Sequence, residues 1–186
     1  AQRLAHLGQR LLLAEHDIKV MHCPGSNLKL GSGISPVPEM RARGITVSLG
    51  ADGAACNNRL DMFEEMRLAA VLQAMRRQPG ILPARDVLWM ATRAGARTLG
   101  LEGDIGSLEV GKKADVIVVD RDRPHIAPGP DPYSTLVYAA RGSDVRTTIV
   151  DGELLVDDFM PVKVDRDEVV MTARAAGREL ATRAGI

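Results

Sequence analysis

Short apolar segments alternate with helical patterns in the N-terminal half of this chain, and this alternation limits the possible folds. Residues 18–22 and residues 45–50 (Ile-Thr-Val-Ser-Leu-Gly) are rich in β-branched side chains, which is typical of buried strands. Between them, the Gly- and Pro-rich residues 24–38 predict a long loop. We expect this loop to end in a short helix around 39–43, which Gly44 is placed to stop. The order of strand, helix and strand indicates a parallel α/β sheet.

Helical patterns lie on both sides of this pair of segments. Residues 5–17, 61–77 and 83–99 carry apolar side chains at helical spacing. The second of these begins with a D-x-x-E motif, which predicts a capping box. We therefore interpret its acidic cluster as a capped, solvated helix start rather than a site. The cluster consists of Asp61, Glu64 and Glu65.

The sequence changes in character near residue 101, after which β patterns dominate. Residues 114–120 form a Val/Ile-rich segment typical of a strand, and the Pro-rich residues 121–132 predict loops. Residues 145–150 and 153–156 flank Asp151-Gly152, which is a strong signal for a two-residue hairpin.

We accordingly expect three parts along the chain. The first belongs to an α/β barrel, the second is a β-rich composite domain, and the third is a charged C-terminal helix. They comprise residues 1–101, 102–164 and 165–186.

Charge and composition exclude some classes of partner. The 24 Lys and Arg are balanced by 24 Asp and Glu, so the formal net charge is zero. This balance gives no reason to expect nucleic acid or an anionic membrane as a partner. No apolar run approaches the roughly 18 residues that a membrane helix needs. A small-molecule substrate or a protein partner fits better.

The cysteines and the start of the chain give two further expectations. Cys23 and Cys56 are the only cysteines and do not form a disulfide framework, which favours a reduced cytoplasmic compartment. The chain opens with Ala-Gln-Arg-Leu-Ala-His, without an initiator Met or a signal-peptide pattern. We expect it to begin within a helix and to be part of something longer.

Asp52 is the sharpest candidate for chemistry. It follows a segment that we expect to be a buried parallel strand, and such folds place their sites at the carboxyl ends of strands. Gly50 and Gly53 flank it, which allows a sharp turn and the close approach of a ligand. The alternative is an Asp that only caps a helix or stabilises a turn.

His22 ends the preceding strand and has an equivalent position. It could contact substrate, bind a metal or transfer protons, or it could be a satisfied structural histidine. Ser26 and Asn27 begin the following loop and could hydrogen-bond a substrate, although ordinary loop residues need no such role.

The remaining candidates are weaker. Cys56 has no evident base beside it, as a nucleophile would need. We expect His125 to be exposed in a loop, and His6 and His16 to lie on a helix surface. The chain has no His-x-His, H-E-x-x-H or Cys-x-x-Cys motif, so it does not carry the roughly three protein ligands of a zinc site by itself.

Four segments together resemble the aminohydrolase branch of the amidohydrolase superfamily. That branch includes methylthioadenosine/S-adenosylhomocysteine deaminases, guanine and cytosine deaminases and triazine chlorohydrolases. The segments are residues 22–30 (His-Cys-Pro-Gly-Ser-Asn-Leu-Lys-Leu), 49–58 (Leu-Gly-Ala-Asp-Gly-Ala-Ala-Cys-Asn-Asn), 60–67 (Leu-Asp-Met-Phe-Glu-Glu-Met-Arg) and 106–115 (Gly-Ser-Leu-Glu-Val-Gly-Lys-Lys-Ala-Asp). The third is especially similar to the adenosine-derivative deaminases.

The resemblance implies the C-terminal part of a metal-dependent (β/α)8 TIM barrel, followed by a small β-sandwich-like domain. It implies one divalent metal ion, zinc by preference and iron or manganese as alternatives. Asp52 matches the metal-binding Asp of the eighth strand, which also carries a proton to the leaving group. His22 matches the end of the seventh strand and would face the substrate together with Ser26 and Asn27.

This sequence departs from the family pattern in two ways. Ala51 stands where the family usually has Thr, which removes a hydroxyl beside Asp52. The His-x-His pair of the first strand and the His and Glu of the fifth strand would precede this chain, and Ala1 stands near the place of the sixth-strand His.

Three hypotheses for function follow. In the first, the complete protein deaminates a purine-type or related heterocycle, with removal of chloride or an alkylamine from a triazine as the alternative reaction. We also expect it to form a homo-oligomer. In the second, the chain is a non-catalytic fragment that lacks the other metal ligands. In the third, which has little support, it is an unrelated α/β enzyme.

Overall fold

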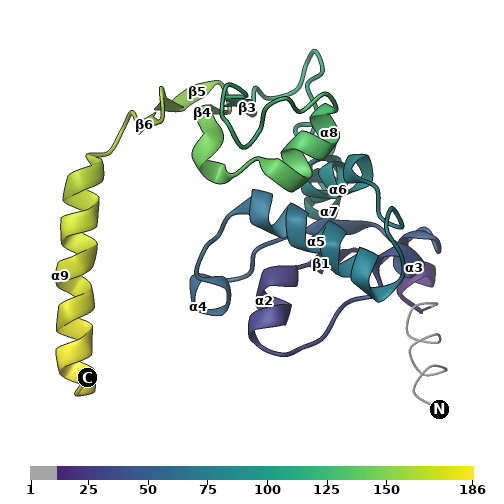
Figure 1. The fold of residues 1–186 in the computed structure, drawn as a ribbon, viewed down its shortest axis with the longest axis horizontal. Coiled ribbons are helices and arrows are strands. Elements are labelled where there is room, and N and C mark those ends of the chain that lie inside the picture. The colour runs from purple at the N-terminus through teal and green to yellow at the C-terminus, as the bar shows by residue number, and fades with distance from the viewer. Residues whose placement is uncertain (1–11) are drawn as a thin grey trace. The chain divides into compact units, whose positions relative to one another are not determined.

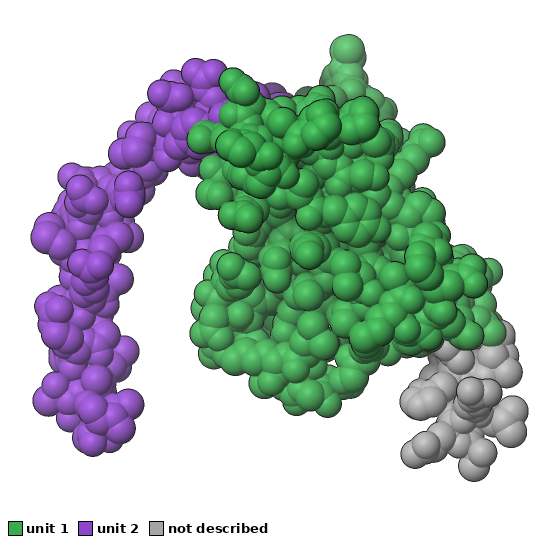
Figure 2. Space-filling model, in the orientation of Figure 1, with its two compact units in different colours: residues 1–112, 121–144 green, residues 113–120, 145–186 purple. Residues whose placement is uncertain are grey.

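The computed structural model describes residues 12–186 and groups them into two compact units (Figure 2). The first unit comprises Ala1–Lys112 and Arg121–Asp144, and the second comprises Lys113–Asp120 and Val145–Ile186. The chain thus passes from one unit to the other more than once. The division of this chain into three parts stays a prediction.

The centre of the first unit is a pair of parallel strands, β1 (Val20–His22) and β2 (Val47–Leu49) (Figure 1). Val20 pairs with Val47 and His22 with Leu49. The parallel α/β arrangement predicted from the sequence is therefore confirmed for these two strands. Both are shorter at their N-terminal ends than the apolar segments that predicted them.

Three short helices lie next to these strands in the chain. Helix α2 (Pro24–Lys29) follows β1, α3 (Val37–Arg41) precedes β2, and α4 (Ala54–Asn57) follows β2. The prediction of a loop from residue 24 was wrong for α2. Pro24 occupies the first turn of α2, where its missing N–H costs nothing and its fixed φ favours the helix. A proline that is typical of a loop therefore begins a helix here.

Helix α5 (Met62–Arg76) has nearly the predicted bounds, and the Asp61 side chain caps it by accepting a hydrogen bond from Phe63 N–H at 2.9 Å. The single helix expected over residues 83–99 is instead two, α6 (Ala84–Ala91) and α7 (Arg93–Leu99). Thr92 lies at the break and its hydroxyl donates to the Leu88 carbonyl at 2.8 Å. Such bonding to the preceding turn competes with the helix ladder and bends helices.

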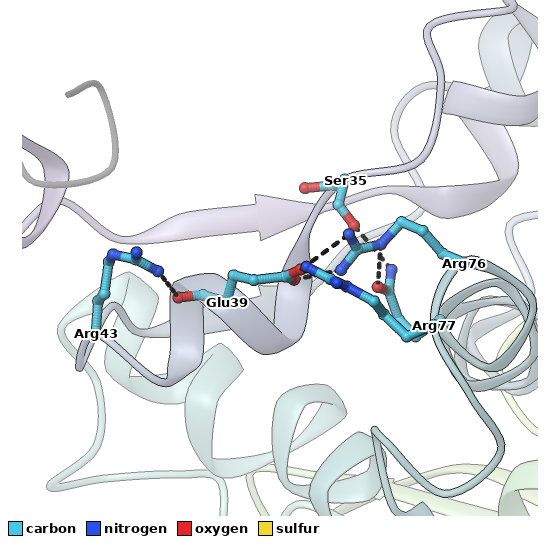
Figure 3. Close-up of polar contacts among 6 residues, drawn as sticks. Ser35, Glu39, Arg43, Arg76 and Arg77 are labelled. Atoms are coloured by element: carbon cyan, nitrogen blue, oxygen red, sulfur yellow. Dashed lines mark hydrogen bonds and ion pairs between the residues drawn. The ribbon is translucent and has the colours of Figure 1, made fainter. Parts of the chain in front are cut away.

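Helices α3, α5, α6 and α7 contact β2 and enclose the core of the first unit. Polar contacts fasten α3 to the end of α5. The Glu39 carboxylate accepts hydrogen bonds from Arg76 at 3.0 Å and from Arg77 Nε at 2.8 Å, and Gln73 donates to the Ser35 carbonyl at 2.8 Å (Figure 3). The most deeply buried apolar side chains are Val37, Val47, Ala69, Val87, Met90, Ala94 and Val137.

The first unit also includes residues 121–144, which begin as the predicted loop. They then form short helical turns that the sequence did not reveal: α8 (Pro132–Ser134), a π-helical turn (Thr135–Ala139) and a 3₁₀ turn (Gly142–Asp144). Asp131 caps α8 by accepting hydrogen bonds from two backbone N–H groups.

The second unit contains an antiparallel sheet in the order β3 (Val116–Val119), β4 (Val145–Val150), β5 (Glu153–Asp157) and β6 (Met160–Pro161). The predicted hairpin between β4 and β5 is confirmed. Asp151 and Gly152 both have positive φ, 51° and 79°, as a type I′ turn requires. Helix α9 (Arg166–Ala184) confirms the helix that was predicted for the tail, and the Asp165 side chain caps it. Within residues 12–186, no helix combines the length and apolar character needed to cross a membrane.

Candidate active site

Strands β1 and β2 end side by side, which brings together the two polar segments that follow them. The Gly50 N–H continues the pairing by donating to the His22 carbonyl at 3.0 Å. A Cβ atom at Gly50 would lie 2.6 Å from Met21 Sδ, so a side chain there would have to displace Met21. The glycine thus keeps the backbone before Asp52 close to β1.

Asp52 is held in a defined direction at the end of β2. Its φ of 62° lies in the left-handed region, which residues with a side chain rarely adopt. Its Oδ2 accepts a hydrogen bond from Ser26 Oγ at 2.7 Å, and its Oδ1 accepts one from Gly53 N–H at 2.7 Å. Strained backbone of this kind persists where the surrounding contacts fix it.

The same contacts favour the charged form of Asp52. The Ser26 hydroxyl and then the Gly53 amide, with a smaller contribution from the Cys56 thiol, outweigh slight burial and hold the pKa of Asp52 below its ordinary value of 3.8. The side chain is exposed. An exposed, ionised carboxylate is a suitable ligand for a divalent metal and a suitable proton acceptor.

Of the other three predicted site residues, Ser26 alone has a hydrogen bond to Asp52 among the contacts found within residues 12–186. It lies in the first turn of α2 and is buried. Asn27 follows it and is half-buried; no side-chain hydrogen bond of Asn27 is found in the described part of the chain. The roles of Ser26 and Asn27 toward a substrate stay predictions.

His22 lies at the end of β1 and is 2% exposed, whereas the neighbouring Met21, on the other face of the strand, is 50% exposed. Burial lowers the pKa of His22 to about 4, so its ring is neutral at pH 7. Neither ring nitrogen has a hydrogen-bond partner among the described residues. A buried imidazole in this state still has one donor and one acceptor to offer.

Glu65 is a polar residue of this region that the sequence did not reveal. Its interpretation as part of a solvated helix start was wrong, because Glu65 is 1% exposed. Its carboxylate accepts hydrogen bonds from Gly25 N–H at 2.9 Å and from Asn57 Nδ2 at 2.7 Å. The sequence signal that could have revealed Glu65 is its helical spacing with Met66 and Ala69, which are buried on the same helix.

The cysteines and the remaining histidines have no evident catalytic arrangement within residues 12–186. Burial, followed by the charge of Asp52, raises the pKa of the Cys23 thiol, which disfavours a reactive thiolate. His125 forms a hydrogen bond of 2.9 Å with Asp144, and His16 is exposed. The prediction for His6 lies outside the described residues.

The side chains present decide how far this chain could bind a metal by itself. Residues 12–186 contain no group of three or more His, Cys, Asp or Glu side chains that could hold an ion together. Asp52 nevertheless fits one position in a ligand set, because it is exposed, ionised and oriented by hydrogen bonds. The side chains of residues 12–186 thus fit a metal site to which they contribute a single carboxylate.

Parallel strands covered by helices define an α/β protein. The Asp52 carboxylate lies at the carboxyl ends of these strands, which is where such folds build their sites. The chain belongs to the amidohydrolase family, whose sequence pattern matches residues 1–155. Its structural neighbours imply a fold of the TIM-barrel type, of which this chain forms a part.

Curated relatives point to the same branch. Over 93% of its length, the chain is 51% identical to a 5'-deoxyadenosine deaminase of Methanosarcina acetivorans. It is 52% identical, over 85% of its length, to a 5-methylthioadenosine/S-adenosylhomocysteine deaminase of Moorella thermoacetica. The chain spans about 40% of the length of the first protein and 37% of the second.

Solved structures agree with this grouping. An adenosine deaminase from Xanthomonas campestris with bound zinc superposes with a TM-score of 0.90 and 37% identity, covering 94% of this chain and 40% of that protein. The zinc complex of an atrazine chlorohydrolase from Arthrobacter aurescens gives a TM-score of 0.79 and 32% identity, covering 87% of this chain and 36% of that protein.

Proposed function

We propose that the complete protein is a metal-dependent hydrolase of non-peptide carbon–nitrogen bonds that deaminates the purine-type ring of an adenosine derivative. Relatives about half identical to this chain carry the names of such deaminases. The observation that carries the proposal is the Asp52 carboxylate, which is exposed at the end of β2 while Ser26 and Gly53 each hold one of its oxygens.

Asp52 has two roles in this proposal. It would be one ligand of a single divalent ion, zinc by preference and iron or manganese as alternatives. Such an ion supplies a Lewis acid that lowers the pKa of water to about 7. Asp52 would also accept the proton of the attacking water and deliver it to the leaving amine. The hydrogen bond from Ser26 keeps the carboxylate ionised and pointed in one direction for both tasks.

We further propose that His22, Ser26 and Asn27 contribute to substrate binding. These residues surround the turn between β1 and α2, which lies beside Asp52 through the Ser26 hydrogen bond. The neutral ring of His22 and the amide of Asn27 can each donate and accept a hydrogen bond, as recognition of a heterocycle requires.

A second candidate is hydrolytic removal of chloride or an alkylamine from a triazine ring. The similarity to an atrazine chlorohydrolase, at 32% identity, supports this second reaction. The same carboxylate would serve both reactions, because each adds water to an electron-poor ring carbon and expels a leaving group.

Three wider proposals accompany the activity. The four-stranded sheet β3–β6 would be part of a small β-sandwich-like domain. The complete protein would form a homo-oligomer. Cytoplasmic location is supported by the two free cysteines, Cys23 and Cys56.

The test uses the full-length protein loaded with zinc and offered adenosine derivatives, guanine, cytosine and triazines. We expect ammonia release from an adenosine derivative. Substitution Asp52→Asn should lower kcat by about 10²- to 10⁴-fold. The matched control is Asp104→Asn, an exposed carboxylate with no side-chain hydrogen bond found within residues 12–186, which should leave kcat unchanged. Near-normal turnover by Asp52→Asn would contradict the proposal.

A further inference from the structure

Glu65 joins two segments that flank Asp52. We propose, on the basis of the proposed function, that Glu65 is a positioning residue whose buried carboxylate fixes the β1–α2 turn and helix α4 against each other and thereby sets the direction of Asp52. The hydrogen bonds of Glu65 run to Gly25 and Asn57, so it would act on Asp52 through Gly25–Ser26 and through α4.

Glu65 contacts the turn between β1 and α2 directly. Glu65 Oε2 accepts the Gly25 N–H at 2.9 Å. A Cβ atom at Gly25 would lie 2.3 Å from Glu65 Oε1 and 2.8 Å from Asn57 Nδ2. The backbone at Gly25 therefore lies directly against the carboxylate, and a side chain at this position would push the carboxylate away.

Glu65 also contacts α4. Glu65 Oε1 accepts a hydrogen bond from Asn57 Nδ2 at 2.7 Å. The Oδ1 atom of Asn57 accepts hydrogen bonds from Arg59 N–H at 3.1 Å and Leu60 N–H at 3.2 Å. Asn57 thus uses both ends of its amide and connects α4, Glu65 and the segment that leads into α5.

Both of these segments also donate hydrogen bonds to Asp52. Gly25 directly precedes Ser26, whose hydroxyl donates to Asp52 Oδ2 at 2.7 Å. Helix α4 begins immediately after Gly53, whose N–H donates to Asp52 Oδ1 at 2.7 Å. Both hydrogen bonds that orient Asp52 therefore come from segments that Glu65 holds. The left-handed φ of Asp52 needs such support from its surroundings.

The chemistry of Glu65 explains why a carboxylate is used. Its two partners both donate hydrogen bonds, and neither carries a charge. A glutamine of the same shape has one acceptor oxygen and one NH₂ group, so one donor would face another donor. Burial of a carboxylate that has no cation beside it costs free energy unless hydrogen bonds compensate. Glu65 is therefore explained better by the geometry that it imposes on its two partners than by a contribution to stability alone.

The test compares Glu65→Gln with the double variant Glu65→Gln/Asn57→Asp in the full-length, zinc-loaded protein. The single variant should lower kcat for the preferred adenosine derivative and speed loss of zinc to a chelator, each by about 10- to 100-fold. In the double variant the introduced glutamine NH₂ can donate to the introduced aspartate carboxylate, which restores the lost bond with the opposite polarity. We expect the double variant to recover most of both losses.

Two further variants keep the test decisive. Glu64→Gln alters the neighbouring residue, which is half-exposed and paired with Arg59 at 3.6 Å, and should leave kcat and zinc retention unchanged. If Glu65→Gln does not fold, Asn57→Ala replaces it, and it should lower kcat and zinc retention in the same direction because one Glu65 contact is lost.

The outcomes separate this inference from the proposed function. Wild-type protein without hydrolytic turnover would overturn the proposed function. An active wild type together with a Glu65→Gln or Asn57→Ala variant that retains normal kcat and zinc would overturn the positioning role alone. A variant that only unfolds at lower temperature, with both readouts normal, would likewise reduce Glu65 to a structural residue.

Discussion

Helix α5 contributes to two carboxylate clusters of different kinds, one toward each of its ends. Toward its start, Glu65 binds the uncharged Gly25 amide and Asn57 side chain. At its end, Arg76 and Arg77 form ion pairs with Glu39 of α3 (Figure 3). The ion pairs of Glu39 with the two arginines stabilise the packing of α3 against α5. The hydrogen bonds of Glu65 instead fix the relative positions of the two segments that donate them.

The two clusters should therefore respond differently to substitution. Changes in the cluster around Glu65 and Asp52 should act on catalysis and metal retention. Changes in the Glu39 cluster should act on the free energy of unfolding and leave catalysis intact.

Among substitutions that leave Asp52 itself unchanged, the largest effect is expected from Gly25→Ala. The new Cβ would lie 2.3 Å from Glu65 Oε1, so the carboxylate would have to move and would lose its bonds to Gly25 and Asn57. We expect kcat to fall about 10- to 100-fold. We also expect the free energy of unfolding to fall by about 1–3 kcal/mol. Enzyme assays and urea unfolding of the full-length protein measure the two effects.

Gly95→Ala is the matched control for that substitution. Gly95 is also helical, and a Cβ atom there would meet no atom within 4 Å. This variant should keep normal kcat and gain about 0.5–1 kcal/mol of stability from the reduced freedom of the unfolded chain. Equal losses of kcat in Gly25→Ala and Gly95→Ala would contradict a special role of the contact between Gly25 and Glu65.

A smaller effect on catalysis is expected from Ser26→Ala. The variant removes the hydrogen bond to Asp52 Oδ2 and the main cause of the lowered Asp52 pKa, while leaving Glu65 in place. We expect kcat to fall about tenfold. Ser32→Ala, which removes an exposed hydroxyl beyond α2, should change nothing. Unchanged kcat in Ser26→Ala would mean that other contacts hold Asp52.

The smallest effect on activity, and a clear one on stability, is expected from Glu39→Gln. Burial opposes the Glu39 charge, but the hydrogen bonds from Arg76 and Arg77 outweigh it and lower the Glu39 pKa from 4.5 to about 2. Because the folded-state pKa is lowered, the stabilisation is fully present above pH 4.5 and is lost as the pH falls toward 2. The variant should lose about 1–2 kcal/mol at pH 7 after allowance for solvent screening.

The pH dependence provides the check on that prediction. Wild-type stability should fall more steeply than that of Glu39→Gln as the pH drops from 4.5 toward 2, and kcat at pH 7 should be the same in both. Glu153→Gln, in the exposed pair with Lys163, should leave the unfolding midpoint unchanged. A loss of kcat in Glu39→Gln would remove the distinction between the two clusters.

The sequence was most informative where the pattern is local. The β-branched residues 45–47, which lead into β2, and the glycines around Asp52 predicted a carboxylate at a strand end, because strand formation and turn formation depend on neighbouring residues. The Asp151-Gly152 hairpin and the Asp61 cap were predictable for the same reason.

Contacts between distant segments were not predictable in this way. Glu65 looked like a solvated helix residue because its partners, Gly25 and Asn57, lie in other segments of the chain. Helix α2 was missed because a proline fits a loop and the first turn of a helix equally well. The break at Thr92 depends on its hydroxyl bonding the Leu88 carbonyl, which the sequence leaves open.

A crystal structure of the full-length protein with zinc would show directly whether Asp52 binds the metal. We predict a carboxylate oxygen of Asp52 about 2.0–2.2 Å from the ion, with the Ser26 hydroxyl still donating to Asp52. Zinc bound without Asp52, or an Asp52 side chain that bonds only its own turn, would contradict a role of Asp52 as metal ligand.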